Sequence, residues 1–385
     1  MSDDVFELVE QTLENDGPDA ALDLLAERFL EEKRYPQLFE ARLMKKRHQL
    51  GLPLLMSELP EDLPSEPRKS YEDAFIAAAR EVGGLFLANG DIERAWPYFR
   101  ALGDSAPVAE AIERVQLAEG MERVIEIALH ERVNPRRGFE LILGHYGICR
   151  AIGFYEQYPD ARTRPDCLKL LVRTLHSELV EGLKRTITRA EGSAPETSSV
   201  PELIAGREWM FEDNNYYVDT SHLIAILRYS LDLQEPDMLR LALELSSYGT
   251  HLGPMFNYKV DPPFENVYVD HAVYLRALLG EQIEEAVAHF RKKLDESNLE
   301  EIGSAPAQVL VGLLTRLGRY SEAADVFLAH LKDLEPSLLA CPTALDLCRM
   351  AADWDRVKQL AREKNDTLSY LAASAQAEQH SPSHR

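Results

Sequence analysis

The chain has 385 residues, 45% of them hydrophobic, which is enough to bury a large core in two or three domains or in one continuous helical array. It carries 65 acidic residues against 42 lysines and arginines, a formal net charge of −23 at pH 7. Because nucleic acids and anionic membranes attract basic surfaces, this excess of acid argues against a protein that binds either of them.

The beginning of the chain and its cysteines predict a cellular compartment. The acidic start MSDDVFELVE has neither the basic nor the apolar stretch of a secretory signal, and no apolar run approaches the length of a membrane span. The four cysteines, Cys149, Cys167, Cys341 and Cys348, form no CxxC pair and match no usual zinc spacing. We therefore expect a cytoplasmic protein with buried free thiols.

Residues 1–115 are expected to fold as helical repeats. A first short helix is predicted to stop at Asn15-Asp16-Gly17-Pro18, where a second helix begins. Apolar residues at helical spacing then continue to Gly51. Four prolines within residues 51–70 predict a surface loop.

The clearest pair of helices is predicted over residues 71–107. Gly83 and Phe86 are expected on its first helix, Gly90 at the turn, and Ala95 and Phe99 on its second helix. Pro107 closes the unit. This arrangement resembles the tetratricopeptide repeat, whose signature pairs Gly-x-x-Tyr with Ala-x-x-x-Phe and a terminal proline. Two positions depart from that signature, because Ala79 stands where tryptophan is usual and Pro97 lies inside the second helix. The resemblance implies stacked antiparallel helix pairs that bind a partner.

Residues 266–372 repeat the same pattern at an interval of about 35 residues, as expected for stacked helical pairs. The three registers are Ile283, Ala286, Phe290 and Leu294, then Tyr320, Ala323, Phe327 and Leu331, and a weaker Trp354, Val357 and Ala361. We therefore predict an all-α fold, a right-handed superhelix (α-solenoid) of antiparallel helix pairs. The small, polar residues 373–385 are expected to form a disordered tail.

The middle region, residues 116–265, is predicted to be helical but without a clean repeat. Asn134 as N-cap and Pro135 at the first helical position start a helix that runs to about residue 155. Further helices are expected over about 166–188, 220–231 and 236–247. His145 and His176 lie on the first two of these four helices. Each is either a general base in a pocket or a hydrogen-bonded core residue.

Two similar junctions between loop and helix mark the candidate site of the middle region. They are Tyr217-Val218-Asp219-Thr220 and Tyr268-Val269-Asp270-His271, and aromatic and polar residues are dense around both. If each junction begins a hairpin, the two lie close together on one edge of the array. The candidate binding residues are Trp209, Asn214, Asn215, Tyr217, Asp219, His222, Tyr268, Asp270 and His271. Alternatively, both aspartates are helix N-caps and the tyrosines seal the contacts between helices.

No metal, other cofactor or catalytic residue is predicted. The carboxylates and imidazoles at the two junctions could suit zinc, manganese or iron, but no HExxH or Glu-x-x-His pair accompanies them. The sequence also lacks a glycine-rich phosphate loop, a nucleophile elbow and a paired-carboxylate motif.

Two functions are expected from these patterns. The first is a scaffold that binds a protein or peptide in a concave groove, and the acidic surface favours a basic or mixed-charge partner. The alternative is a small-molecule or metal site, with or without enzymatic activity, at the junctions within residues 209–271.

Overall fold

The computed structural model describes residues 3–56, 59–258 and 260–380, and over these ranges it is all-helical, without a strand. The all-α prediction is thereby confirmed. The chain divides into two compact units, residues 1–167 and 168–385. The boundaries expected after residues 115 and 265 lie inside these units, so the division into three regions stays a prediction. No helix in the described ranges is both long and apolar enough to cross a membrane.

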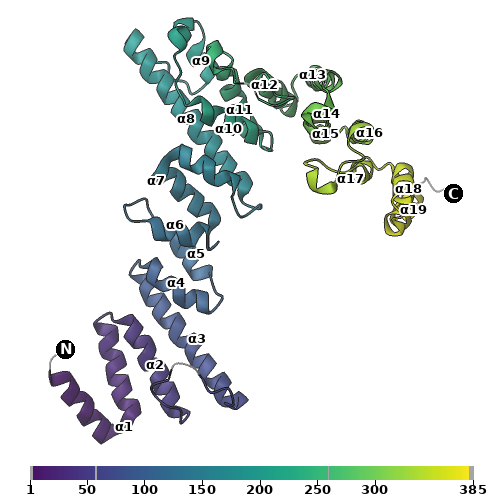
Figure 1. The fold of residues 1–385 in the computed structure, drawn as a ribbon. Coiled ribbons are helices and arrows are strands. Elements are labelled where there is room, and N and C mark those ends of the chain that lie inside the picture. Colours follow the sequence, from purple (N-terminus) through teal and green to yellow (C-terminus); the bar gives the residue numbers. More distant parts are fainter. Residues whose placement is uncertain (1–2, 57–58, 259, 381–385) are drawn as a thin grey trace. The chain divides into compact units, whose positions relative to one another are not determined.

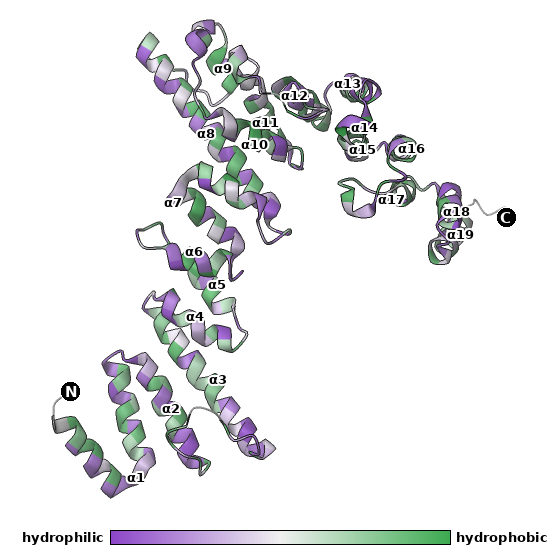
Figure 2. Ribbon diagram, viewed as in Figure 1, coloured by the Kyte–Doolittle hydropathy of each residue, from purple (hydrophilic) through white to green (hydrophobic). Residues whose placement is uncertain are grey.

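In the first unit each helix packs against the next one in the chain (Figure 1). Its helices are α1 (Asp3–Glu31), α2 (Tyr35–Gln49), α3 (Ser65–Ala88), α4 (Ile92–Ala101), α5 (Ala106–Glu113), α6 (Glu122–Leu129) and α7 (Pro135–Glu156). Hydrophobic and hydrophilic residues are interspersed along these helices (Figure 2), which lets each bury one side and expose the other. The unit boundary falls within α8 (Arg164–Glu191).

The second unit contains short and long helices, several of which pack as consecutive pairs. They are α9 (Val200–Ile204), η1 (Glu208–Asn214), α10 (Thr220–Ser230), α11 (Pro236–Gly249), η2 (Pro254–Phe256), α12 (Val267–Leu278), α13 (Ile283–Asp295), α14 (Leu299–Ile302), α15 (Ala305–Arg316), α16 (Tyr320–His330), η3 (Pro336–Leu338), α17 (Ala344–Met350), α18 (Trp354–Glu363) and α19 (Thr367–His380).

The helix pair α3 and α4 shows why the repeat pattern contains a glycine and a phenylalanine. A Cβ atom on Gly83 would lie 2.7 Å from Cε2 of Phe99, so only glycine leaves room for this buried ring. Ala95 is also fully buried, and Gly90 makes the turn with φ 77°. The corresponding Ala286 and Phe290 of the second unit lie in its core. The packing is compatible with a helical-repeat protein.

The predicted surface loop of residues 51–70 is shorter than expected. Helix α3 already begins at Ser65, within the predicted loop. Pro67 lies in the first turn of that helix, where its missing N–H would have no intrahelical partner. Pro64, the N-cap of α3, and Pro67 therefore mark the end of the loop.

The predicted tail was wrong over residues 373–380, because α19 continues through His380. Ala373 is buried in the core of the second unit, and the surrounding segment is rich in alanine, the strongest helix former. Residues 381–385 of the predicted tail lie outside the described residues.

Two helices contain a break at a glycine. Helix α1 breaks at Gly17, as predicted, with φ 85°. Helix α7 breaks at Gly147, with φ 79°, where an uninterrupted helix was expected.

Cys149 follows this second break and is exposed, so the prediction that it is buried was wrong. Cys167 and Cys348 are buried as predicted, and Cys341 is half-buried.

Candidate functional site

A groove of about 600 Å³ opens between α6 and α7 of the first unit, and we call it the α6–α7 groove. Its floor is apolar, because Ile125 of α6 and Ile142 of α7 are both buried. Tyr146 lines the groove with 44% of its surface exposed, and Phe154 lines it half-buried. An apolar floor with accessible aromatic walls is the composition of a site that holds an apolar side chain.

The break in α7 separates the aromatic walls of the groove. Tyr146 ends the first helical part, and Phe154 lies on the second part, beyond Gly147. The backbone of Gly147 has a positive φ that residues with a side chain rarely adopt. The shape of this groove therefore depends on one glycine.

The rims of the α6–α7 groove carry charges of both signs. The guanidinium of Arg150 lies 5.5 Å from the centre of the Phe154 ring, and the His130 ring lies 5.9 Å from it. Glu122 and Glu126 line the α6 side. Within the described ranges Arg150 has no carboxylate partner, so its charge is available to a ligand.

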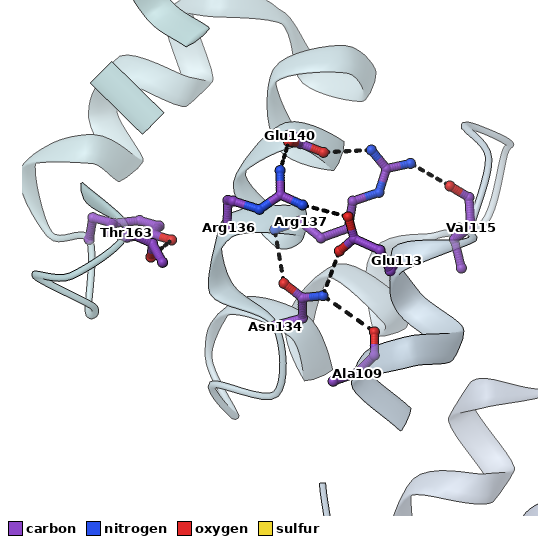
Figure 3. Close-up of polar contacts among 9 residues, drawn as sticks. Ala109, Glu113, Val115, Asn134, Arg136, Arg137, Glu140 and Thr163 are labelled. Carbon is purple, nitrogen blue, oxygen red and sulfur yellow. Dashed lines mark hydrogen bonds and ion pairs between the residues drawn. The ribbon is translucent and has the colours of Figure 1, made fainter. Parts of the chain in front are cut away.

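A network of polar contacts holds the first turn of α7 against α5 (Figure 3). The Asn134 side chain accepts a hydrogen bond from the Arg137 N–H at 3.2 Å and donates one to Glu113 at 2.9 Å. Arg136 bridges Glu113 and Glu140, while Arg137 pairs with Glu140 at 2.6 Å. The Asn134 amide and the Arg136 guanidinium lower the pKa of Glu113. These contacts fix the helix that forms one wall of the groove.

Sequence reasoning missed Tyr146, Arg150 and Phe154 as site residues. Their spacing of four predicts one face of a continuous helix, which is also typical of a buried face, whereas the break at Gly147 lies between Tyr146 and Arg150. The sequence contains one partial signal, a glycine at position 147 inside the predicted apolar helix, but whether that glycine breaks the helix depends on tertiary packing.

The aromatic residues of the predicted 209–271 site pack around Tyr248 of α11, in the second unit. The Tyr248 hydroxyl accepts a hydrogen bond from the backbone N–H of Tyr217 at 2.8 Å. The Phe211 ring lies 6.0 Å from Tyr248 and stacks on His251 at 5.2 Å. Burial raises the pKa of Tyr248, which stays neutral. These rings join helices, as the structural alternative predicted.

Tyr268 also packs against α11, at Gly249. A Cβ atom on Gly249 would lie 2.1 Å from the Tyr268 ring, so glycine is required for their contact. The Tyr268 carbonyl accepts a hydrogen bond from Ser246 at 2.6 Å, and its hydroxyl donates to the Phe256 carbonyl at 3.3 Å. Burial raises the pKa of Tyr268 to about 12.

Asp219 is the N-cap of α10, as the structural alternative predicted. Its carboxylate accepts hydrogen bonds from the N–H groups of Ser221 at 2.8 Å and His222 at 3.4 Å. The bonds from Ser221 lower the pKa of Asp219. Partial desolvation raises the pKa of Glu178 on α8, and the neighbouring His222 opposes that rise.

Asp270 is not an N-cap, so that prediction was wrong. Helix α12 begins earlier, with Asn266 as its N-cap, which places Asp270 inside the helix. The buried Asp270 carboxylate accepts from the Asn266 N–H at 2.9 Å, from His289 at 2.8 Å and from Lys293 at 2.9 Å. The hydrogen bonds from His289 and Lys293 of α13 to the buried Asp270 hold α12 against α13.

His271 is fully buried beside Asp270 but has different neighbours. Its Nδ1 atom donates to the Val267 carbonyl at 2.6 Å, and its ring lies 4.3 Å from that of Phe264. In the described part of the chain its Nε2 atom has no hydrogen-bond partner. Burial lowers the pKa of His271 to about 4, so the ring is neutral at pH 7.

The remaining predicted residues do not complete a common site with these. Trp209 and Asn215 are exposed, and the Asn214 side chain fits against Gly253, where a Cβ atom would lie 2.3 Å from its oxygen. Over residues 3–56, 59–258 and 260–380, no group of three or more histidines, cysteines and carboxylates is arranged to hold a metal ion. The small-molecule or metal site therefore stays a prediction.

The two histidines of the middle region have different surroundings. His176 is buried and its Nε2 atom donates to Glu244 at 2.8 Å, as expected for a hydrogen-bonded core residue. His145 is half-exposed and packs edge-on against the Tyr146 ring at 4.5 Å.

No protein-family model, curated protein or solved structure matches this chain.

Proposed function

We propose that this protein is a helical-repeat scaffold that binds a peptide, or a segment of another protein, in the α6–α7 groove. The observation that carries the proposal is a groove of about 600 Å³ with a buried apolar floor and two aromatic walls, of which Tyr146 is exposed and Phe154 half-buried. Its volume lies in the range of about 300–1,000 Å³ that is common for ligand sites. Repeat proteins bind extended segments on the concave surface of their superhelix, and the proposal assigns this role to the α6–α7 groove.

The groove favours a partner with one apolar anchor and charges of both signs. Ile125 and Ile142 contact the anchor, while Tyr146 and Phe154 enclose it. Exposed aromatic residues contribute strongly to binding because they bury a large area with few torsions to immobilise. Carboxylates on α6 and Arg150 on α7 then select the orientation of the bound segment.

Affinity capture from a native lysate tests the proposal, with the full chain immobilised as wild type, Phe154→Asp and Leu55→Asp. Leu55 is 88% exposed and does not line the groove, so its substitution is the matched control. We expect a partner that wild type and Leu55→Asp retain and that Phe154→Asp loses. Tyr146→Ala, a milder change at an exposed ring, is expected to weaken retention.

Circular dichroism and thermal melting establish that each immobilised variant is folded. The proposal is wrong if folded Phe154→Asp retains the same proteins as the control. It is also wrong if wild type enriches nothing over a charge-matched acidic protein.

A further inference from the structure

A second groove, of about 440 Å³, lies between the two halves of α1, and we call it the α1 groove. Its apolar lining comes from both sides of the break at Gly17 and consists of Val5, Leu8, Val9, Leu24 and Leu25. Because residues 5–9 and 24–28 line one groove, the two halves of α1 run back along each other as a hairpin (Figure 1).

The first half of α1 has apolar side chains that its contact with the second half leaves exposed. Leu8 lines the groove with 43% of its surface exposed. Phe6, 63% exposed, and Leu13, also exposed, lie two helical turns apart on the adjoining face. Apolar side chains are therefore exposed both in the groove and on another face of the same helix.

The rim of the α1 groove is acidic. Glu27 and Glu31 of α1 and Glu32, directly after the helix, line it, and Arg28, paired with Glu32 at 2.7 Å, is the one cation among its lining residues. In the described part of the chain, Glu27 and Glu31 make no ion pair or hydrogen bond, although Glu27 lies near enough to Arg42 to raise its pKa. Residues 1–32 contain eleven acidic residues and a single arginine.

We propose that the α1 groove binds a cationic amphipathic helix of a partner protein. The apolar face of that helix contacts Leu8, Leu24 and Leu25, and its lysines or arginines pair with Glu27 and Glu31. A groove between two antiparallel helices matches the ridges of a third helix, whose anchors recur every three to four residues. A second copy of this chain is a poor occupant, because its α1 would bring a second set of carboxylates to the same place.

The α1 groove is formed by a different helix from the α6–α7 groove, so this proposal goes beyond the proposed function and can fail without it. The full-length protein is titrated into a fluorescein-labelled peptide of about 18 residues, five helical turns of leucine and lysine with the leucines on one face. Fluorescence anisotropy gives the Kd. Two comparison peptides replace lysine by glutamate, or scramble the order so that the apolar face is lost.

Matched variants of the protein separate the groove from general acidity. Glu27→Lys with Glu31→Lys reverses two rim charges, and Asp73→Lys with Glu119→Lys makes the same change at exposed carboxylates that lie outside the groove and have no ion pair within the described ranges. We expect the rim reversal to raise the Kd of the leucine–lysine peptide about tenfold or more. Leu8→Asp is expected to raise it as well. The control pair and Phe154→Asp are expected to leave it within about twofold of wild type.

Three results would overturn the proposal. One is equal affinity for the scrambled or the leucine–glutamate peptide, and another is equal weakening by the rim reversal and its control. The third is a dimer in sedimentation that Leu8→Asp dissociates, together with no peptide binding by wild type, since a second copy would then occupy the groove. Circular dichroism confirms that each variant is folded, so a loss of binding reports on the groove.

Discussion

Among single residues, His271 shows most clearly how the burial of a side chain changes a measurable property, its pKa. Its ring is fully buried in α12, with the nearby Asp270 carboxylate raising its pKa and Arg228 lowering it. Desolvation, which acts in the same direction as Arg228, outweighs the Val267 carbonyl and the Asp270 carboxylate, so the pKa of His271 falls from 6.5 to about 4. The folded state therefore disfavours the protonated ring that the unfolded chain forms readily below pH 6.5.

This shift predicts a pH dependence of stability. The contribution of neutral His271 is fully present above pH 6.5 and is lost as the pH falls from about 6.5 to about 4. In urea unfolding, we expect His271→Phe to reduce the loss of unfolding free energy between pH 7 and pH 5 by about 2 kcal/mol. His251→Phe, at an exposed histidine, is the control. An unchanged pH profile for His271→Phe would contradict the assignment.

At the scale of elements, two neighbouring glycines of α3 allow the effect of packing on stability to be measured separately from the effect of helix propensity. A Cβ atom on Gly83 meets the buried Phe99 ring, whereas one on Gly84 meets nothing within 4 Å. We expect Gly83→Ala to destabilise the protein by about 1–3 kcal/mol through overpacking. Gly84→Ala is expected to stabilise it by about 0.5–1 kcal/mol, since alanine favours the helix. Chemical denaturation of both variants decides whether the α3–α4 contact is as close as described.

Helix starts could be predicted from the sequence wherever the capping signal is local. Asn134 before Pro135 and Asp219 before Thr220 each mark the true N-terminus of a helix. The second Tyr-Val-Asp segment could not be read this way, because Asp270 lies inside α12 and bonds to His289 and Lys293 of a later helix. Such partners are distant in sequence, so the sequence alone does not show whether an aspartate after Tyr-Val is an N-cap or lies inside a helix.

The break in α7 was not predicted for a related reason. Gly144 and Gly147 lie one turn apart in the same apolar helix, yet only Gly147 adopts a positive φ. A Cβ atom on Gly144 would instead lie 2.6 Å from the side chain of Leu117, in the loop between α5 and α6. Which glycine breaks the helix depends on what packs against each, and that is settled by tertiary structure.

For the molecule as a whole, the sequence predicted the all-helical class, whereas the groove that we propose for binding lies outside the predicted 209–271 segment. The dense aromatic residues around 209–271 pack against one another, as Tyr248 and Tyr268 show. The α6–α7 groove is lined by a sparser set beside a helix break, which includes Tyr146, Arg150 and Phe154. Aromatic density alone does not separate buried from accessible rings, and accessibility is what a binding groove requires.

Site-specific photo-crosslinking tests the central claim, that the α6–α7 groove binds a partner, most directly. A benzophenone amino acid replaces Phe154 in one sample and the exposed Leu55, outside the groove, in the other. After irradiation in native lysate, the account predicts a discrete crosslinked partner at position 154, suppressed by excess unlabelled wild-type protein and missing at position 55. The same crosslinks at both positions, or none at position 154 from folded protein, would contradict it.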